Sequence, residues 1–357
     1  MNACIFNYLI SSIFNDYHQA YKSPSLSILM PQFDAYGIGN ALVDFIVDSD
    51  EDFLAKFDFK KGIMQLVDER LFVDVMNHLK KKKVTILPGG SAANTIIGMA
   101  RLGAKTAYAG KVGDDFHAQQ YINGLKKAKV RPDVVSEKGL TGTCISMVTK
   151  DKERTMATCL GISGELEPGD LNWTDLGKSK IIHAEGYLLN TPNQTQVTEQ
   201  AMAFAKQKGI LVSFDCSDPF LVKTFKSDIK RIISKYADII FLNEAEAKEL
   251  TGLPAGKAIK KIGNKNQIIC LKLGKKGSLV KKGSKIIRIP IYKVKAKDTT
   301  GAGDLYAAGM LYGISKGFDL KTSGMYASFL AGEIVSQYGA YLKPVKKERL
   351  KKWLKKH

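Results

Sequence analysis

The sequence predicts a three-layer α/β/α protein with a mostly parallel central sheet. Two observations support this: from Ala35 onward short apolar runs alternate with amphipathic stretches, and glycine follows several of those stretches directly. The expected strands are Ala35–Gly39, Thr106–Gly110, Ile181–Ala184, Ile210–Asp215, Ile239–Leu242 and Ile268–Leu273. The expected helices include Ala92–Leu102, Gln196–Lys208 and Ser227–Tyr236. Ligands of such sheets bind where the strands end, so polar residues just past a strand become candidate site residues.

Two segments interrupt this alternation. Val43–Val67 and Thr143–Thr158 each contain short strand-like runs without a long helix between them. We therefore expect a small second sheet, built from about 43–68 and 141–160, that stands off the main layer. No linker rich in Pro, Gly or Ser divides the chain, which favours one domain over 34–357. We expect residues 1–33 to form a poorly ordered N-terminal extension, because its apolar stretch is short and lacks the flanks of a secretory signal.

Composition limits the classes of function. The chain has 357 residues, 45% of them apolar, and no run reaches the roughly 18 apolar residues of a membrane span. Five scattered cysteines without a Cys-x-x-Cys pair argue against a disulfide framework or structural zinc, and suit a reducing cytoplasm. Only seven of the 54 basic residues are Arg, so the formal charge of +19 indicates a lysine-rich surface rather than specific nucleic-acid recognition. We expect neither a nucleic acid nor a membrane as a partner.

The string Asp298–Asp304 (DTTGAGD) is the strongest functional signal in the chain. Two glycines ahead of an apolar helical stretch leave backbone N–H groups without partners at the positive end of a helix dipole. Side chains larger than Gly or Ala at Gly301, Ala302 and Gly303 would keep a phosphate away from that backbone. Asp304 falls in the first helical turn, where its carboxylate can accept a proton from a hydroxyl that attacks phosphorus. A plain helix entry with an Asp that favours the dipole is the alternative.

Two further patterns place polar residues beside strand ends. Asn40 and Asp44 offer donor and acceptor groups suited to vicinal hydroxyls, although a turn Asn and a solvated Asp explain the same letters. Asn243 and Glu246 lie three residues apart and offer oxygen ligands suited to hydrated Mg²⁺. An N-terminal cap with an acidic first turn explains that second pair without a metal.

Together these motifs resemble the PfkB carbohydrate-kinase family, also called the ribokinase family, which includes adenosine kinases. Asp298–Asp304 matches its second signature. Pro88–Thr95, where two glycines permit a tight turn and Ser91 is the expected N-cap, matches the first signature together with Ala100–Ala104 and Gly110–Phe116. The resemblance covers about 33–343. It implies a ribokinase-like fold in which the small sheet is a lid over the substrate, and transfer of the ATP γ-phosphoryl group to a primary hydroxyl.

The resemblance also assigns roles to individual residues. Asp304 would accept the proton, the backbone of Gly301, Ala302 and Gly303 would hold the developing charge, and Arg154 would reach the transferring phosphoryl group. The substrate would be bound by Asn40, Asp44, Gly90, Asn94 and Tyr187, the nucleotide by Lys272, Gly274, Gly277 and Thr299, and the metal by Asn243 and Glu246. On the sequence alone Lys272 is equally a strand-edge lysine, and Tyr187 an ordinary half-buried tyrosine.

The implied cofactors are ATP and Mg²⁺, with a monovalent cation such as K⁺ near Asp298 and Gln337–Ala340. The favoured function is an adenosine-kinase-like nucleoside kinase, because the sugar-side residues and Arg154 match that branch. A fructokinase- or ribokinase-like sugar kinase is the alternative, since hydroxyl contacts barely distinguish a free sugar from a ribose. A basic nucleic-acid-binding protein on a kinase relic is a third hypothesis, which the intact Asp304 opposes. We expect a monomer or homodimer with a small-molecule substrate.

Overall fold

The protein is described by a computed structural model over residues 31–80, 82–151 and 153–356. Most of the expected N-terminal extension, residues 1–30, therefore lies outside the described residues. Its last two residues belong to the body, which begins at Gln32: the backbone N–H groups of Gln32 and Phe33 donate to the carbonyl of Lys178, and the Phe33 side chain is buried. In the described part of the chain, every helix is too short or too polar to span a lipid bilayer.

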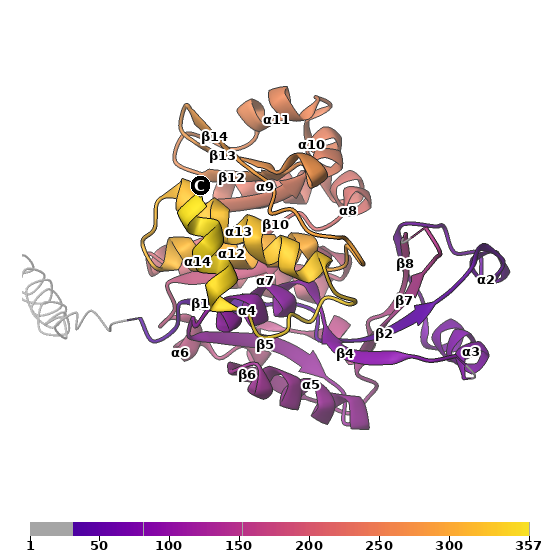
Figure 1. Ribbon diagram of the computed structural model, residues 1–357. Helices are drawn as coiled ribbons and strands as arrows, with labels where there is room; N and C mark the ends of the chain where they lie inside the picture. Colours follow the sequence, from indigo (N-terminus) through magenta and orange to yellow (C-terminus); the bar gives the residue numbers. More distant parts are fainter. Residues whose placement is uncertain (1–30, 81, 152, 357) are drawn as a thin grey trace, which may run out of the picture. The chain divides into compact units, whose positions relative to one another are not determined.

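The described residues form a nine-stranded main sheet and a five-stranded small sheet (Figure 1). The main sheet has the strand order β14-β13-β12-β11-β10-β9-β1-β5-β6; all pairs from β12 to β6 are parallel, and β13 and β14 add antiparallel. Its strands are β1 (Ala35–Ile38), β5 (Thr106–Val112), β6 (Val130–Ser136), β9 (Ile181–Glu185), β10 (Leu211–Asp215), β11 (Ile239–Asn243), β12 (Ile268–Lys272), β13 (Ser278–Lys282) and β14 (Lys285–Ile289). The predicted mostly parallel sheet is confirmed, and all six expected strands belong to it.

The main sheet separates two buried cores. Neighbouring strand residues alternate between them, as Ile181 and Ile239 belong to the first core while Ile182 and Ile240 belong to the second. A strand buried on both faces needs an uninterrupted apolar run, which is why these strands are visible in the sequence. The first core is covered by α4 (Ser91–Arg101), α5 (Phe116–Lys127), α12 (Ala302–Ser315), α13 (Leu320–Val335) and α14 (Lys347–Lys356). The second is covered by α6 (Trp173–Leu176), α7 (Pro192–Gln207), α8 (Pro219–Thr224), α9 (Lys226–Lys235), α10 (Glu244–Thr251) and α11 (Ala255–Lys261).

The small sheet lies beside the main sheet within the same body (Figure 1). Its strand order is β3-β8-β7-β2-β4, from β2 (Leu42–Asp48), β3 (Met64–Leu66), β4 (Thr85–Gly89), β7 (Gly142–Val148) and β8 (Arg154–Cys159). Alternate β2 residues such as Phe45 are buried in a core with α2 (Glu51–Lys56) and α3 (Glu69–Leu79), where the Phe45 ring meets Phe72 edge-on. The intervening residues, Asp44 among them, therefore face the other way.

Candidate functional site

Five neighbouring strands of the main sheet supply a polar residue to one cavity. Lys272 ends β12, Asn243 ends β11, Asp215 ends β10, Glu185 ends β9, and Asn40 follows β1 by two residues. All five line a cavity of about 350 Å³, to which strands of the small sheet also contribute. The site therefore lies where the carboxyl ends of parallel strands meet, as expected for an open α/β sheet.

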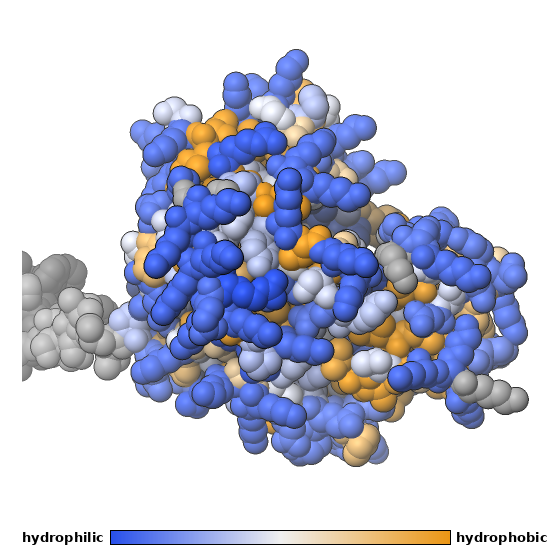
Figure 2. Space-filling view, viewed as in Figure 1, coloured by the Kyte–Doolittle hydropathy of each residue, from blue (hydrophilic) through white to orange (hydrophobic). Residues whose placement is uncertain are grey.

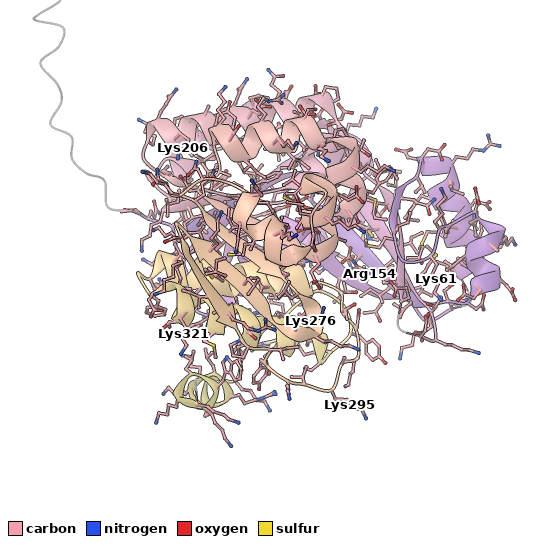
Figure 3. The ribbon with its side chains drawn as sticks, turned by 90° about the horizontal axis from the view of Figure 1, so that it is seen from above. Lys61, Arg154, Lys206, Lys276, Lys295 and Lys321 are labelled. Atoms are coloured by element: carbon pink, nitrogen blue, oxygen red, sulfur yellow. The ribbon has the colours of Figure 1, made fainter. Side chains whose placement is uncertain are left out.

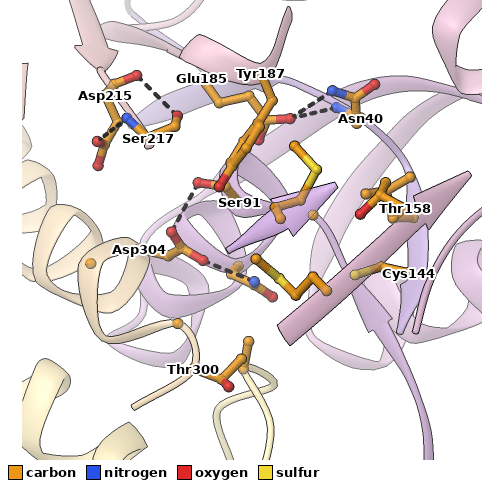
Figure 4. Close-up of a pocket in the computed structure, with 18 of the residues that line it drawn as sticks. Asn40, Ser91, Cys144, Thr158, Glu185, Tyr187, Asp215, Ser217, Thr300 and Asp304 are labelled. Carbon is orange, nitrogen blue, oxygen red and sulfur yellow. Dashed lines mark hydrogen bonds between the residues drawn. The ribbon is translucent and has the colours of Figure 1, made fainter. Parts of the chain in front are cut away.

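Asp304 lies in the first turn of α12 and lines this cavity (Figure 4). We call the side of the cavity that is formed by α12 and the strand ends of the main sheet its floor, and the side that is formed by the small sheet its wall. The Ser91 hydroxyl donates to its Oδ1 at 2.9 Å, and Asn94 Nδ2 donates to its Oδ2 at 3.0 Å. Burial raises the pKa of Asp304 above its usual value, while the bonds from Asn94 and Ser91 act in the opposite direction. Ser91 is not the N-cap that we expected, because α4 already begins at Ser91 with Gly90 as its cap; its hydroxyl is therefore available to hold Asp304 instead.

The start of α12 forms a candidate anion site. Gly301 caps the helix with a φ of 73°, a left-handed conformation that glycine adopts without strain, and no side chain caps the first turn. The amides of that turn therefore point into the cavity with the positive end of the dipole. Asp298 fixes the loop ahead of it, because its Oδ1 accepts from Thr300 N and its Oδ2 accepts from Gly339 N, each at 2.8 Å. The contact with Gly339 joins the loop to the segment near which we expected a monovalent cation.

Lys272 places a positive charge behind the anion site. A Cβ added to Gly303 would lie 3.2 Å from Lys272 Nζ, so the glycine lets the ammonium approach the helix start. Lys272 Nζ is also 3.0 Å from Asp215 Oδ2, in a pair that is largely buried. Although burial acts to lower it, the charges of Asp215 and Glu246 raise the pKa of Lys272 above its usual value, so the ammonium stays charged.

Asn243 and Glu246 form a capping box at the start of α10, the alternative that the sequence left open. Asn243 N donates to Glu246 Oε2 at 2.8 Å, and Glu246 N donates to Asn243 Oδ1 at 2.9 Å. Burial raises the pKa of Glu246 to about 7. Among the described residues, no group of three or more His, Cys, Asp or Glu side chains could hold a metal ion. Asn243 and Glu246 both line the cavity, and their expected role in holding a hydrated Mg²⁺ stays a prediction.

Asp44 lies on the small sheet with its carboxylate toward the cavity. A Cβ on Gly89 of the paired strand would come within 2.4 Å of that carboxylate, so only glycine leaves room for it. Burial raises the pKa of Asp44 to about 7, although the nearby Arg154 acts to lower it. Arg154 begins β8 and lies on the side of the small sheet toward the main body (Figure 3). Among the described residues neither side chain has a hydrogen-bond partner, so both are available to a ligand.

Asn40, Gly90 and Asn94, for which the family resemblance implied sugar contacts, line the same cavity. Asn94 Oδ1 is buried and has no hydrogen-bond partner in the described part of the chain, as a ligand-binding acceptor would be. The Asn40 side chain is already engaged: its Oδ1 accepts from Gln194 Nε2 at 2.7 Å, and its Nδ2 donates to Glu185 Oε1 at 3.2 Å. Asn40 therefore has at most one amide hydrogen left for a substrate hydroxyl.

Tyr187 lines the cavity beside an apolar surface that comes mostly from the small sheet. Burial raises the pKa of its phenol well above the usual value. The apolar surface consists of Leu42, Met64, Leu66, Met156 and Leu160. Of the expected nucleotide residues, Gly274 and Thr299 line the cavity with Lys272, whereas Gly277 does not; a Cβ at Gly277 would instead meet the backbone of Ile289.

The sequence analysis missed Glu185, Asp215 and Ser217 as cavity residues. Ser217 has a φ of 70°, unusual for a residue other than glycine, and its hydroxyl accepts from Gly186 N at 2.9 Å. The signal for the two acids was present, since each ends or directly follows an expected strand, as Asn40 and Asn243 do. Ser217 carries no such signal, because its backbone conformation depends on contacts with a neighbouring strand.

Comparisons with known proteins show which family and fold the chain resembles. A family model described as pfkB family carbohydrate kinase matches residues 57–347. Adenosine kinase of Saccharomyces cerevisiae is 29% identical over 329 residues, which cover 85% of this chain and 94% of that protein. The crystal structure of a probable sugar kinase from Rhizobium etli CFN 42 has a TM-score of 0.86 at 28% identity, covering 91% of this chain and 100% of that one. Adenosine kinase from Sinorhizobium meliloti has a TM-score of 0.83 at 29% identity, covering 90% and 99%.

Proposed function

This chain belongs to the pfkB family of carbohydrate kinases, phosphotransferases that act on an alcohol group, and we propose that its own acceptor is the 5′-hydroxyl of a ribonucleoside, with adenosine preferred. The observation that carries the proposal is one cavity with three kinds of lining. It contains Asp304 and the anion site, polar side chains that suit sugar hydroxyls (Asn40, Asp44 and Asn94), and an apolar surface. A kinase for a ribonucleoside needs all of these parts within reach of one substrate.

We assign the chemical step to the floor of the cavity. Asp304 would accept the proton of the attacking hydroxyl, because two donors hold its carboxylate in place and burial makes it a stronger base than a solvated carboxylate. The amides at Gly301–Gly303, with Lys272 behind them and Arg154 from the small sheet, would hold the charge that develops on the phosphoryl oxygens. Asn243 and Glu246 would hold the waters of a Mg²⁺, which when bound neutralises charge on the phosphates.

The apolar surface favours a nucleoside over a free sugar. Asp44, Gly90 and Asn94 would hold ribose hydroxyls, with Asn40 contributing one donor, and these contacts suit either kind of acceptor. Beyond them, Tyr187 and the thioethers of Met64 and Met156 offer a surface that a flat nucleobase would cover and a hexose would leave exposed to water. The adenosine kinases among the relatives support this acceptor.

Several accompanying properties stay proposals. The small sheet would act as a lid that closes over the acceptor and keeps water from the phosphoryl group. A monovalent cation such as K⁺ would lie near Asp298. We also propose that the protein is cytoplasmic, which the four buried free cysteines of the described residues support. We further propose a role in purine salvage, and a monomer or homodimer as the working form.

A substrate panel with ATP and Mg²⁺ tests the proposed function. Adenosine, inosine, guanosine, cytidine, ribose and fructose are compared at equal concentration by the rate of ADP release. Adenosine is expected to give the highest kcat/KM. If fructose or ribose reacts efficiently while adenosine is inert, the sugar-kinase alternative replaces the proposal. If no acceptor reacts and the protein is retained on DNA in a salt-sensitive way, both kinase proposals are wrong.

A further inference from the structure

Glu185 is a buried carboxylate that lines the cavity and to which the proposed chemistry gives no role. It ends β9 with 1% of its surface exposed. Its Oε1 accepts from the backbone N–H of Asn40 at 2.8 Å and from Asn40 Nδ2 at 3.2 Å (Figure 4). Its Oε2 accepts from the backbone N–H of Ala92. A buried charge is costly unless it is fully hydrogen-bonded, and the three donors around the Glu185 carboxylate offset that cost.

The contact with Ala92 caps helix α4 from a different element. Gly90 is the N-cap of α4 and has no side chain to supply an acceptor, so the first turn has no side-chain cap of its own. Glu185 Oε2 takes that place, since Ala92 is the second residue of the helix, and a carboxylate there also favours the helix dipole. The start of α4 is thereby fixed to the ends of β1 and β9.

The same turn of α4 holds the proposed base. Ser91 and Asn94 donate to the two carboxylate oxygens of Asp304, and the Thr95 hydroxyl donates to its backbone carbonyl at 3.1 Å. Glu185 itself does not contact Asp304. It contacts the backbone one residue away from Ser91, and so sets the position from which Ser91 and Asn94 donate.

We propose that Glu185 is a positioning residue for the phosphoryl transfer, which holds the start of α4 against the end of β1 so that Ser91 and Asn94 keep Asp304 in its reactive geometry. The inference rests on the proposed role of Asp304 as the base. Gly39 is part of the same arrangement, because a Cβ there would lie 2.9 Å from Glu185 Oε2 and 2.8 Å from the Ala92 Cβ. Only glycine at that position leaves room for the carboxylate.

The test compares Glu185→Gln with Asp34→Asn, a matched control at the opposite end of β1. Asp34 is also buried, at 5% exposure, and its carboxylate also accepts from three donors, on Lys180, Lys316 and the backbone of Lys105. Each variant loses a buried carboxylate that joins three elements, but only Glu185 lies at the cavity. Both are assayed with the acceptor from the panel that the wild type phosphorylates fastest, so an error in the proposed acceptor does not affect the result.

In Glu185→Gln the side-chain NH₂ group must face a backbone N–H group, and we expect the start of α4 to shift. As a result kcat should fall by roughly 10–100-fold, while the KM for ATP stays within about threefold of wild type. Asp34→Asn should keep kcat within about threefold while its Tm falls. In an Asp304→Asn background the further loss from Glu185→Gln should be under about threefold, because the base through which it acts is gone. Should Glu185→Gln fail to fold, Gly39→Ala disturbs the same contact and is expected to lower kcat in the same way.

Three outcomes would overturn the proposal. The first is a normal kcat in the folded variant. The second is an acceptor KM that rises with kcat unchanged, which would make Glu185 a substrate-binding group. The third is a full, multiplicative loss in the Asp304→Asn background, which would make its role structural only. A wild-type protein that transfers phosphate to no acceptor would instead contradict the proposed function.

Discussion

The floor of the cavity and the wall formed by the small sheet differ in how their polar groups are used. On the floor, Asp304 and Glu185 have donors on every carboxylate oxygen. On the wall, the side chains of Asp44 and Arg154 have no hydrogen-bond partner among the described residues, and the other small-sheet residues that line the cavity are mostly apolar. A group that is already bonded can hold a geometry, whereas an unpartnered buried group can gain from a ligand. We therefore propose that the floor supplies the base and that Asp44 on the wall selects the acceptor, while Arg154 reaches from the wall to the phosphoryl group.

The largest effect is expected from Asp304→Asn, which removes the base while keeping its shape. We expect kcat to fall by roughly 10²–10⁴-fold, the usual range for loss of a general base, with nucleotide affinity little changed. Single-turnover kinetics and ATP binding measured on the same preparation check both parts. A variant with near-normal turnover would show that the floor does not supply the base.

A smaller loss is expected from Asp44→Ala on the wall. Removing a carboxylate that accepts from ribose hydroxyls should lower kcat/KM for the ribonucleoside by about 10–100-fold, mainly through the KM of the acceptor. Steady-state kinetics with varied acceptor at saturating ATP measure this. An unchanged acceptor KM would place the sugar elsewhere in the cavity.

The dependence of kcat/KM on pH should reflect the ionisation of Asp304 on the floor and of Asp44 on the wall. Burial raises the pKa of Asp44 to about 7 and raises that of Asp304 as well. Asp304 must be ionised to accept a proton, and ionised Asp44 accepts hydrogen bonds from hydroxyls more strongly and on both oxygens. We therefore expect kcat/KM to increase about tenfold between pH 6 and pH 8, with a plateau above. A profile that is flat from pH 5.5 to pH 8 would show that neither carboxylate titrates in the working range.

The smallest effect concerns stability. The carboxyl of Asp44 has a usual pKa of 3.8 and a pKa of about 7 in the folded protein, so the folded state holds the proton more tightly. The contribution of this carboxyl group to the free energy of unfolding is fully present below about pH 3.8 and is lost as the pH rises through 7. Asp44→Asn cannot ionise, and we expect it to raise Tm by roughly 2–5 °C at pH 8 and by less at pH 5. Differential scanning calorimetry at the two pH values decides; a lower Tm at pH 8 would contradict this.

The sequence was sufficient for the main sheet wherever strands are buried on both faces. It was insufficient at the edges, where other constraints apply. Strand β6 contains Pro132, which is tolerated because β6 is the last strand of the sheet and needs fewer ladder bonds. Strand β13 contains two lysines in sequence, and one of them, Lys281, is buried with its ammonium donating to the Ile262 carbonyl. Neither pattern resembles a strand before the neighbouring elements are known.

The candidate site, like the main sheet, could be predicted from the sequence only in part. The motif around Asp304 was enough to propose its role, whereas the roles of Asn94 and Asp44 came from the resemblance of their motifs to the family. The partners of those residues come from distant parts of the chain, as Gln194 does for Asn40 across 154 positions. That contact leaves Asn40 less free to bind a hydroxyl than its motif suggested. Only the folded arrangement shows which polar groups are engaged and which are open.

One measurement tests the division between floor and wall most directly: the ratio of kcat/KM for adenosine to that for 2′-deoxyadenosine, in wild type, Asp304→Asn and Asp44→Ala. We predict a wild-type ratio of about 10–100, because the missing hydroxyl leaves a wall group unpaired. Asp304→Asn should keep that ratio within about threefold although its turnover is far lower, and Asp44→Ala should reduce it to near unity. If Asp304→Asn collapses the ratio, or Asp44→Ala leaves it intact, chemistry and acceptor choice are not divided between floor and wall.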